Sequence, residues 1–446
     1  MWLTLYNIFA VMVFSYSLIL FFSYLMLVVQ SYRAQARLKV DLPDDETIKY
    51  MLKSSPLTPG VSIIAPAYNE EVTIIDNVNS LMHIDYPNFE IIIVNDASTD
   101  RTMELLINEY KLVVVDKEHG GRKADGSNAG INVCSNKYFV CTDVDCIIEP
   151  MALYRMMWLV VNSHEPMIGV SATMLMSNNC TVDEGRVSEA RVPTRFFPMF
   201  QQLEYLRSFL IGKLGWSNFN ALPNISGGFG LFDTDVVVKS GGYDQTSMAE
   251  DMDMLLRMVT YMCNSGKPYK VAQVPAVCCW TEGPNTAKQL FRQRIRWARG
   301  LFEIISHHRK LFANPHYGFL GVVTLTYMFL FEFLAPIFEA VGFLFMIWLI
   351  IIGGVNWETM AIIFAMIYLF SILLTMIIIL LDVVAGSVNW DNKPKAYLTL
   401  LFASLIEPFI YHPFVSYCSN YGYWQFIRNT TATWTPIQRR GVKKKK

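Results

Sequence analysis

The sequence is poor in charge and shows no regular arrangement of cysteines. Charged residues make up only 17% of the 446 residues and hydrophobic residues 53%, which is apolar for a soluble protein. The formal net charge of −1 argues against nucleic acid as a partner. The eight cysteines form no CxxC pair and show no zinc-ligand spacing with histidine. We therefore expect free, buried thiols in a reducing compartment, not a zinc site or a disulfide framework.

The apolar residues gather at the two ends of the chain. Trp2 to Val29 carries no charged residue and exceeds the roughly 20 apolar residues that a membrane span requires. Arg33, Arg37 and Lys39 follow closely, so the positive-inside rule puts the amino terminus outside and the next domain in the cytoplasm. We expect residues 1–30 to be an uncleaved transmembrane anchor, followed by a polar linker at residues 31–59.

The apolar character returns from about Tyr317. We expect residues 301–318 to be an interfacial amphipathic segment and residues 319–418 to be a bundle of three or four transmembrane helices. Within this bundle, Met360 to Leu381 is a clear span and Tyr397 to Tyr417 is a second one.

The segment from Tyr317 to Ile352 leaves two possibilities open. A straight helix of that length would measure about 54 Å, well beyond the roughly 30 Å of a hydrocarbon core. It is expected either as an interfacial piece plus one span or as two spans broken near Pro336. The tail at residues 419–446 includes Arg439, Arg440 and four terminal lysines, which favours the cytoplasm. That placement requires an even number of crossings after the middle domain.

Residues 60–300 form a middle domain in which short apolar runs alternate with segments of helical character. This alternation predicts an α/β fold with a parallel sheet covered on both faces, in which ligands bind at the carboxyl ends of the strands. The predicted strands are Val61–Ala65, Glu90–Val94, Lys111–Val115 and Tyr138–Thr142, and the predicted helices between them are Glu71–Met82, Arg101–Tyr110 and Ala124–Cys134.

Carboxylates follow two of the predicted strands. Asp96 and Asp100 come just after Val94, where a carboxylate can hold a base or ribose edge, although these residues are also typical of a helix cap. Asp143 and Asp145 follow the fourth strand. Two carboxylates two residues apart at a strand end can point to the same side, where they form a hard oxygen site for Mg²⁺ or Mn²⁺ carrying a diphosphate.

Two further elements have residue types suited to group transfer. In Ala249-Glu250-Asp251, a carboxylate can deprotonate an acceptor hydroxyl, but acidic residues are equally favoured at a helix amino terminus. In the run Gln293 to Trp297, Arg296 can bind phosphate and Trp297 can stack on a sugar ring. The neighbouring arginines are typical of a basic interfacial helix, which does not explain the glutamine and the tryptophan.

Together these elements resemble the family 2 glycosyltransferases, in particular the processive synthases of hyaluronan, chitin, cellulose and poly-N-acetylglucosamine. The resemblance covers about Val61 to Gly300 and the arrangement of apolar segments at both ends. The matching stretches, all in family order, are Pro66-Ala-Tyr68-Asn69-Glu70, Asn95-Asp96-Ala-Ser-Thr-Asp100, Gly121-Arg-Lys123-Ala-Asp-Gly-Ser-Asn128-Ala-Gly130, Asp143-Val-Asp145, Ser226-Gly-Gly228-Phe-Gly230, Ala249-Glu250-Asp251 and Gln293-Arg-Ile-Arg296-Trp297. The last resembles the Gln-x-x-Arg-Trp signature of processive members.

The resemblance implies a nucleotide-sugar-binding, Rossmann-like glycosyltransferase A fold and a role for each matching residue. By this likeness the donor-binding residues are Tyr68, Glu70, Asp96, Lys123, Asn128, Asp143, Gln293 and Arg296; the metal ligands for Mg²⁺ or Mn²⁺ are Asp143 and Asp145; the general base is Asp251; and the acceptor-binding residues are Trp297, Gly228 and Glu250.

The implied activity is inverting, metal-dependent transfer from a nucleotide-sugar, expected to be a UDP-sugar, to a growing β-linked polysaccharide that is secreted across the membrane. Expected partners are the donor, a polysaccharide or lipid-linked acceptor, the lipid bilayer and accessory export proteins, but no nucleic acid. The expected location is multi-pass in a bacterial inner (plasma) membrane, with the catalytic domain cytoplasmic.

Two alternatives and one further feature remain open. The chain can instead be a non-processive glycosyltransferase acting on a lipid carrier, or a transporter or receptor whose domain only binds nucleotide-sugars. Glu332, Glu339 and Glu407 lie within apolar segments. Carboxylates are costly in lipid and usually face a polar path or a partner, so they either line a translocation path or sit at interface depth.

Overall fold

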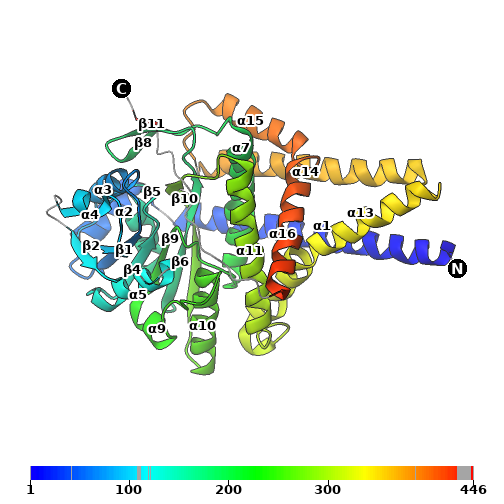
Figure 1. The fold of residues 1–446 in the computed structure, drawn as a ribbon. Coiled ribbons are helices and arrows are strands. Elements are labelled where there is room, and N and C mark those ends of the chain that lie inside the picture. Colours follow the sequence, from blue (N-terminus) through cyan, green and yellow to red (C-terminus); the bar gives the residue numbers. More distant parts are fainter. Residues whose placement is uncertain are drawn as a thin grey trace.

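The computed structural model describes residues 2–41, 43–107, 112–118, 120, 122–386, 388–428 and 443–444. An α/β domain lies at one end of the molecule, and long apolar helices project from it toward the amino terminus (Figure 1). Arg439 and Arg440, which the sequence predicts in a cytoplasmic tail, lie outside the described residues. All eight cysteines are free in the structure, and all but Cys134 and Cys263 are buried.

A mixed eight-stranded sheet forms the centre of the α/β domain. Its strand order is β3-β2-β1-β4-β9-β6-β10-β5. Strands β1, β2, β3 and β4 run parallel, β10 is parallel to β6, and β9 is antiparallel to both β4 and β6. The strands are β1 (Val61–Ala67), β2 (Phe89–Asn95), β3 (Val113–Asp116), β4 (Tyr138–Thr142), β5 (Cys146–Ile148), β6 (Met167–Met176), β9 (Phe229–Asp233) and β10 (Lys270–Thr281). The predicted α/β fold with a mostly parallel, Rossmann-like sheet is confirmed.

Alternate residues of the strands explain why both faces of the sheet are covered. Along β1, Ile63 and Ala65 pack into one hydrophobic cluster while Ile64 packs into the other, because successive side chains point to opposite faces. The first cluster holds α2 (Asp45–Ser54), α3 (Ile74–Met82) and α6 (Ala152–Val161); the second holds α5 (Lys123–Val133), α7 (Phe196–Leu206), α8 (Leu214–Asn218) and α10 (Glu250–Asn264). Two short helices, α4 (Thr102–Ile107) and α9 (Thr234–Lys239), complete the domain.

The predicted strands and helices of the first half agree with the structure to within a few residues. The end of α4 cannot be compared with the predicted Arg101–Tyr110, because residues 108–111 lie outside the described part. A small second sheet, absent from the prediction, pairs β7 (Thr181–Asp183) with β8 (Arg186–Glu189) and β11 (Lys443–Lys444).

Helix α1 (Trp2–Asp41) is longer than the predicted anchor and continues into the stretch that the sequence suggested as a linker. Its inner end packs on the α/β domain rather than standing free: Ser31 donates a hydrogen bond to the carbonyl of Leu210, and Leu27 is buried. A Cβ on Gly215 would lie only 2.9 Å from the carbonyl oxygen of Leu27, so a glycine permits this close approach.

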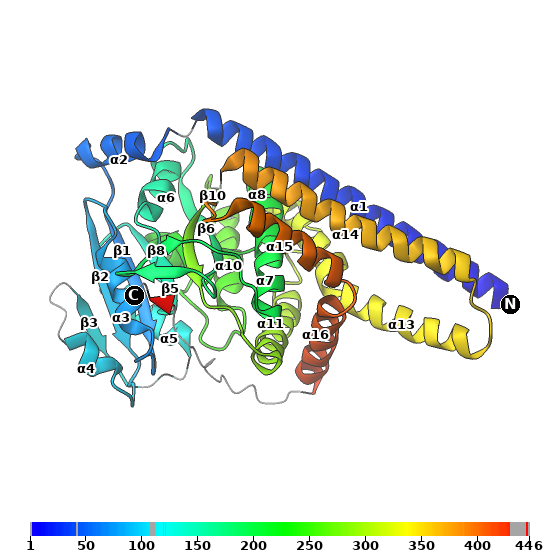
Figure 2. The ribbon, with the colours of Figure 1, turned by 90° about the horizontal axis from the view of Figure 1, so that it is seen from above.

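Within the described residues, three helices are long and apolar enough to cross a membrane: Phe14–Leu38, Leu320–Ile351 and Trp357–Val384. The middle one is a single run, so of the two possibilities that the sequence left open the structure does not show two spans broken near Pro336. It contains the π-helical turns η3 (Leu320–Thr324) and η4 (Phe329–Phe333), the short α12 (Leu325–Met328) and then α13 (Ala335–Ile351). Helix α14 (Trp357–Ala385) packs against α1, as Figure 2 shows, and α13 projects in the same direction (Figures 1 and 2).

The last apolar region is bent. Helices α15 (Lys393–Ile406) and α16 (Tyr411–Ile427) meet at 61° across a short break that contains Glu407, so they form either one broken span or a re-entrant loop. Helix α16 packs along α11 (Ala287–His307) of the α/β domain. The stretch predicted as an interfacial segment, residues 301–318, begins with the end of α11. After α11 its one helical element is the 3-10 turn Pro315–Tyr317, before the next span.

Two ion pairs join residues near the middle of the chain to this last region. Arg207 makes a bidentate contact with Glu407, at 2.7 Å to one oxygen and 2.5 Å to the other, and both side chains are largely buried. Arg191 contacts Asp391 at 2.9 Å, but these side chains are 42% and 37% exposed. Their different burial predicts different contributions to stability, because an unpaired buried charge is far more costly than an unpaired exposed one.

We expect Glu407→Gln to lower the free energy of unfolding by about 3 kcal/mol, because it leaves the Arg207 guanidinium buried without its counter-charge. Asp391→Asn is the matched control and should cost less than about 1 kcal/mol. Thermal denaturation in detergent measures both. Equal shifts in the two variants would contradict a dominant role of burial, and the double variant Arg207→Met/Glu407→Leu should recover part of the loss.

Candidate active site

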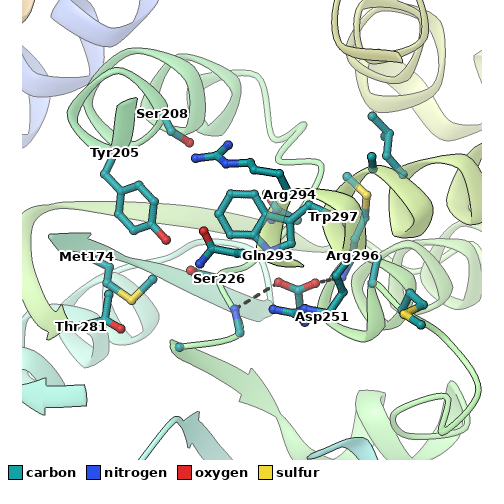
Figure 3. Close-up of a pocket in the computed structure, with 18 of the residues that line it drawn as sticks. Met174, Tyr205, Ser208, Ser226, Asp251, Thr281, Gln293, Arg294, Arg296 and Trp297 are labelled. Carbon is teal, nitrogen blue, oxygen red and sulfur yellow. Dashed lines mark hydrogen bonds between the residues drawn. The ribbon is translucent and has the colours of Figure 1, made fainter. Parts of the chain in front are cut away.

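A single cavity of about 1240 Å³ extends from the carboxyl edge of the sheet to the apolar helices. Its lining includes the ends of β1, β2 and β4, the start of α10 and one face of α11. On the far side it reaches Tyr24 of α1, Tyr327 and Glu332 before α13, and Glu407 and Tyr411 at the bend. Figure 3 shows part of this cavity, with Asp251, Gln293, Arg296 and Trp297 around one open space.

The loops after β1 and β2 are tied to each other. Asn69 has a positive φ of 56°, and its side-chain oxygen accepts a hydrogen bond from the Thr99 main chain at 2.8 Å. The Glu70 main chain donates to the hydroxyl of Thr102 at 2.8 Å. These bonds hold Tyr68 and Glu70 at the edge of the sheet, where both line the cavity.

Asp96 lies at the end of β2 and is buried. It accepts hydrogen bonds from the Lys117 ammonium at 2.8 Å and from the main-chain N–H of Gly120 at 2.9 Å. Lys117 also pairs with Asp125 at the start of α5. Asp96 therefore sits inside a small network, and its carboxylate is oriented before any ligand binds.

The end of β4 carries the two aspartates predicted to hold a metal. Ligand atoms of Asp143, Asp145 and Cys146 lie within 4.8 Å of one another. Asp145 and Cys146 are buried, whereas the Asp143 side chain is 40% exposed and faces the cavity. A hard divalent cation can take oxygen ligands from both carboxylates and complete its coordination with oxygens of a diphosphate in the cavity. These residues therefore fit a metal.

Lys123, the first residue of α5, connects the aspartate pair to the next loop. Its ammonium lies 2.5 Å from an Asp143 oxygen and donates to the carbonyl of Gly227 at 2.6 Å. Although burial works against the charge, the Asp143 carboxylate holds the pKa of Lys123 well above its usual value. Lys123 is therefore a permanent cation at this end of the cavity.

Asp251 lies in the first turn of α10 and faces the same loop. One oxygen accepts from the Gly227 N–H at 3.1 Å and the other from the Met252 N–H at 2.8 Å. Burial and the neighbouring Asp251 charge raise the pKa of Glu250. The segment before the helix is held by α11, because Glu303 accepts a hydrogen bond from the Met248 N–H at 3.1 Å.

The run Gln293 to Trp297 lies on α11, which begins with a capping box formed by Thr286 and Gln289. On a helix, residues three and four apart share a face, so Gln293, Arg296 and Trp297 point toward one side, and all three line the cavity. The side-chain oxygen of Gln293 accepts a hydrogen bond from Gln201 at 2.7 Å.

Arg294 is one of the arginines that the sequence suggested as part of a basic interfacial helix, yet its contacts hold this face of α11 together. Its guanidinium pairs with both oxygens of Glu204 and lies over the Trp297 ring, 4.5 Å from the ring centroid. The hydroxyl of Tyr411 donates to Glu204 at 2.9 Å. The cluster therefore joins α7, α11 and the bent pair of helices. Figure 3 shows Arg294 beside Trp297.

Of the residues that the resemblance assigns to the site, all but one line the cavity. The exception is Asn128, whose amide donates to the Tyr243 carbonyl and accepts from the Tyr243 N–H, at 2.8 and 2.9 Å. Its side chain therefore braces the segment that leads to α10. A Cβ on Gly228 would lie 2.7 Å from the Met174 sulfur, which explains the glycine there by close packing.

Sequence reasoning missed Glu204, Arg207, Lys213 and Tyr411, which also line the cavity. The first three are the only charged residues of the mostly apolar run Phe196 to Leu214, and their presence there was the available signal. The partners of Glu204 and Arg207 lie 90 and 200 residues away in sequence, so no local pattern reveals these pairs.

The sequence matches the profile of glycosyl transferase family 2 over residues 62–214 and that of glycosyl transferase family group 2 over residues 205–386. It is 29% identical over 272 residues to poly-β-1,6-N-acetyl-D-glucosamine synthase of Staphylococcus aureus (strain COL), covering 58% of this chain and 60% of that one. Its identity to the synthase of the same name from Staphylococcus epidermidis (strain ATCC 35984) is 28% over 249 residues, with 55% of each chain covered.

The chain thus spans about 60% of the length of the curated relatives it matches. Among solved structures, a mannosyltransferase of Pyrobaculum calidifontis in complex with GDP-mannose and Mn²⁺ has a TM-score of 0.47 and 16% identity, covering 91% of this chain and 100% of that chain. Two successive glycosyl transferase family 2 profiles thus match residues 62–386, which identifies a glycosyltransferase that resembles poly-β-1,6-N-acetyl-D-glucosamine synthases over part of their length.

Proposed function

We propose that the chain transfers a sugar, with inversion, from a UDP-sugar to the end of a growing β-linked polysaccharide and passes the product across the membrane. The observation that carries this proposal is the continuity of one cavity from the acidic strand ends, past Asp251 and Trp297, to the apolar helices. A domain that only binds nucleotide-sugars has no need of a base and an aromatic platform arranged along such a cavity.

In the proposed reaction the donor lies along the carboxyl edge of the sheet. Tyr68, Glu70 and Asp96 contact its uridine end, and Lys123, Gln293 and Arg296 approach the diphosphate. The fixed charge of Lys123, held by Asp143, supports this assignment. Lys123 and Arg296 stabilise the departing nucleoside diphosphate, where negative charge grows in the transition state.

Asp143 and Asp145 hold a divalent cation, Mg²⁺ or Mn²⁺, in this proposal. Their hard oxygen atoms and the open side of Asp143 support it. When bound, such an ion supplies Lewis-acid stabilisation of the diphosphate.

Asp251 acts as the base toward the acceptor hydroxyl. Its two main-chain hydrogen bonds fix the carboxylate in place, and both it and Glu250 line the cavity beside Gly228. Asp251 takes the hydroxyl proton as the acceptor oxygen attacks the anomeric carbon, so an α-linked donor gives a β-linked product. Trp297 seats the acceptor end through the apolar face of a sugar ring.

The proposed membrane topology has three spans. Helix α1 is the first crossing, and the helices Leu320–Ile351 and Trp357–Val384 form a hairpin of two crossings after the catalytic domain. The bent pair α15–α16 then lies on the same side of the membrane as the catalytic domain. This arrangement satisfies the even number that a cytoplasmic tail requires and puts the catalytic domain in the cytoplasm of a bacterial cell, at its inner membrane. Glu332 and Glu407 line the cavity where the product would leave, toward accessory export proteins.

We expect Asp145→Asn to abolish sugar transfer and the metal-dependent part of donor binding, because one of two anionic ligands is lost from a site with few protein ligands. Calorimetric titration of the donor with and without Mn²⁺ measures the binding, and nucleoside diphosphate release measures the transfer. Asp235→Asn, at an exposed position with a side chain 82% accessible, is the control. Wild-type activity in excess EDTA would rule out the metal.

Asp251→Asn should remove transfer and leave donor affinity within about threefold, because a base that acts on the acceptor contributes to the chemical step. The carboxamide oxygen can still accept the hydrogen bond from the Gly227 N–H, which preserves the loop. Turnover and donor affinity are measured on the same preparation. Surviving turnover with collapsed donor affinity would make Asp251 a binding residue instead.

Trp297→Ala should shorten the products, because losing the ring weakens seating of the acceptor by about 1–2 kcal/mol while the donor is exchanged. The measurement is product size per amount of folded protein in nanodiscs, with donors tested as a panel that begins with UDP-N-acetylglucosamine. Trp357→Ala, an exposed tryptophan at the start of α14, is the control for interfacial anchoring. Wild-type products of a single added sugar would favour the lipid-carrier alternative.

A further inference from the structure

Lys213 is a charged residue of the cavity that the proposed reaction does not use. It ends the π-helical segment η1 (Arg207–Lys213), which separates α7 from α8. Irregular helical turns of this kind occur frequently at functional sites. Lys213 lines the cavity together with Ser208, Phe209 and Gly212 of the same segment.

The Lys213 side chain is buried but has no counter-ion at contact distance. It is only 7% exposed, and among the residues that the structure describes its ammonium has neither a hydrogen bond nor an ion pair. The ammonium lies over the face of the Phe209 ring, 4.9 Å from the ring centroid. Burial lowers the pKa of Lys213 to about 8, against the opposing effect of Asp251.

Three other cations around the cavity differ from Lys213 in this respect. Lys123 is paired with Asp143, Arg207 with Glu407 and Arg294 with Glu204. Each of these pairs is complete without a ligand. A buried ammonium without a partner is unfavourable, so its presence in a cavity indicates that a ligand supplies the missing group.

The position of Lys213 indicates which ligand it meets. Lys213 lines the same cavity as Asp251, the proposed base, whose charge opposes the effect of burial on the pKa of Lys213. Helix α8, which follows Lys213 directly, packs along α1. Lys213 therefore lies on the acceptor side of Asp251, toward the apolar helices.

We propose that Lys213 forms an acceptor subsite for an anionic group, either the carboxylate of an acidic sugar or the phosphate of a lipid-linked primer. This inference rests on the proposed transfer reaction and adds the charge of its acceptor. A neutral acceptor would leave the ammonium without a counter-charge in a site from which water is displaced, whereas an anion forms a charge-assisted hydrogen bond there.

Proton transfer strengthens the argument. When Asp251 takes the acceptor proton it becomes neutral, and Lys213 loses the negative charge that reaches it. A neighbouring unpaired cation disfavours that protonation. An anionic group bound at Lys213 compensates the ammonium throughout the reaction, so Asp251 can act as a base without leaving a net positive charge behind.

The test uses the full chain in nanodiscs with a donor that it turns over. Three acceptors are compared: a neutral β-linked N-acetylglucosamine oligosaccharide, an oligosaccharide of the same length containing a uronic acid, and a sugar linked to a short polyprenyl phosphate. We expect KM for one of the two anionic acceptors to be about tenfold lower than for the neutral one, as a charge-assisted contact implies. Whichever anionic acceptor shows the preference identifies the source of the anion.

Lys213→Gln should abolish this preference, raising KM about tenfold for the anionic acceptor and leaving it within about twofold for the neutral one. Lys213→Arg should retain the preference. Lys239→Gln, an exposed lysine of α9 with a side chain 53% accessible, is the matched control. Donor affinity and elution as folded protein are recorded for each variant, so a folding defect is recognised directly.

Three outcomes are decisive. Equal KM values for all acceptors in the wild-type protein would overturn the proposal, as would a Lys213→Gln variant that loses kcat equally on every acceptor, since the lysine would then act through Asp251. An unchanged preference in Lys213→Gln would also overturn it. Absence of turnover with every donor and acceptor would instead contradict the proposed transfer reaction, which keeps the two failures distinct.

Discussion

Lys123 is the cation on which the acidic edge of the sheet depends. Parallel strands bring Asp96 and the Asp143–Asp145 pair to one edge, and α10 adds Glu250 and Asp251 from the other side of the cavity. Such a concentration of carboxylates repels itself at low dielectric. Lys123 binds Asp143 directly and reaches Asp251 through the Gly227 peptide group, whose carbonyl accepts from the lysine and whose N–H donates to the aspartate. One side chain thereby links the proposed diphosphate end of the site to the proposed base.

A second electrostatic layer joins the catalytic domain to the apolar helices. The Arg207–Glu407 and Arg294–Glu204 pairs and the Tyr411 hydroxyl are buried polar contacts between segments distant in sequence. Buried pairs contribute little net stability compared with apolar packing, but they are costly to break or misplace. Their effect here is to fix the register of the bent helices against α7 and α11, so that the cavity continues past Trp297 instead of closing at the domain surface.

Much of the catalytic domain was predictable because its signals are local. The apolar runs predicted the bounds of β1, β2 and β4 to within two residues. Helical spacing predicted that Gln293, Arg296 and Trp297 share one face, and all three line the cavity. The role of Asn128 was not predictable, because its partner is the main chain of Tyr243, brought close only by the fold. The π-helical segment η1 was hidden, because no local pattern in Arg207–Lys213 distinguishes it from a regular helix. The bend between α15 and α16 contains Pro408, which indicates a break in the helix, but the 61° angle depends on tertiary packing.

The contacts behind Trp297 connect the membrane part of the molecule to the proposed acceptor site. The Arg294 guanidinium lies over one face of the ring, so that face is unavailable to a sugar, and the opposite face is the one that can bind the acceptor. Glu204 and Tyr411 hold the guanidinium, and Tyr411 is the first residue of α16. A displacement of α16 relative to α11 would therefore move the cation that positions the ring. In the proposed mechanism this couples the seating of the acceptor end to the helices along which the product leaves, through three side chains and without any movement of the donor-binding edge.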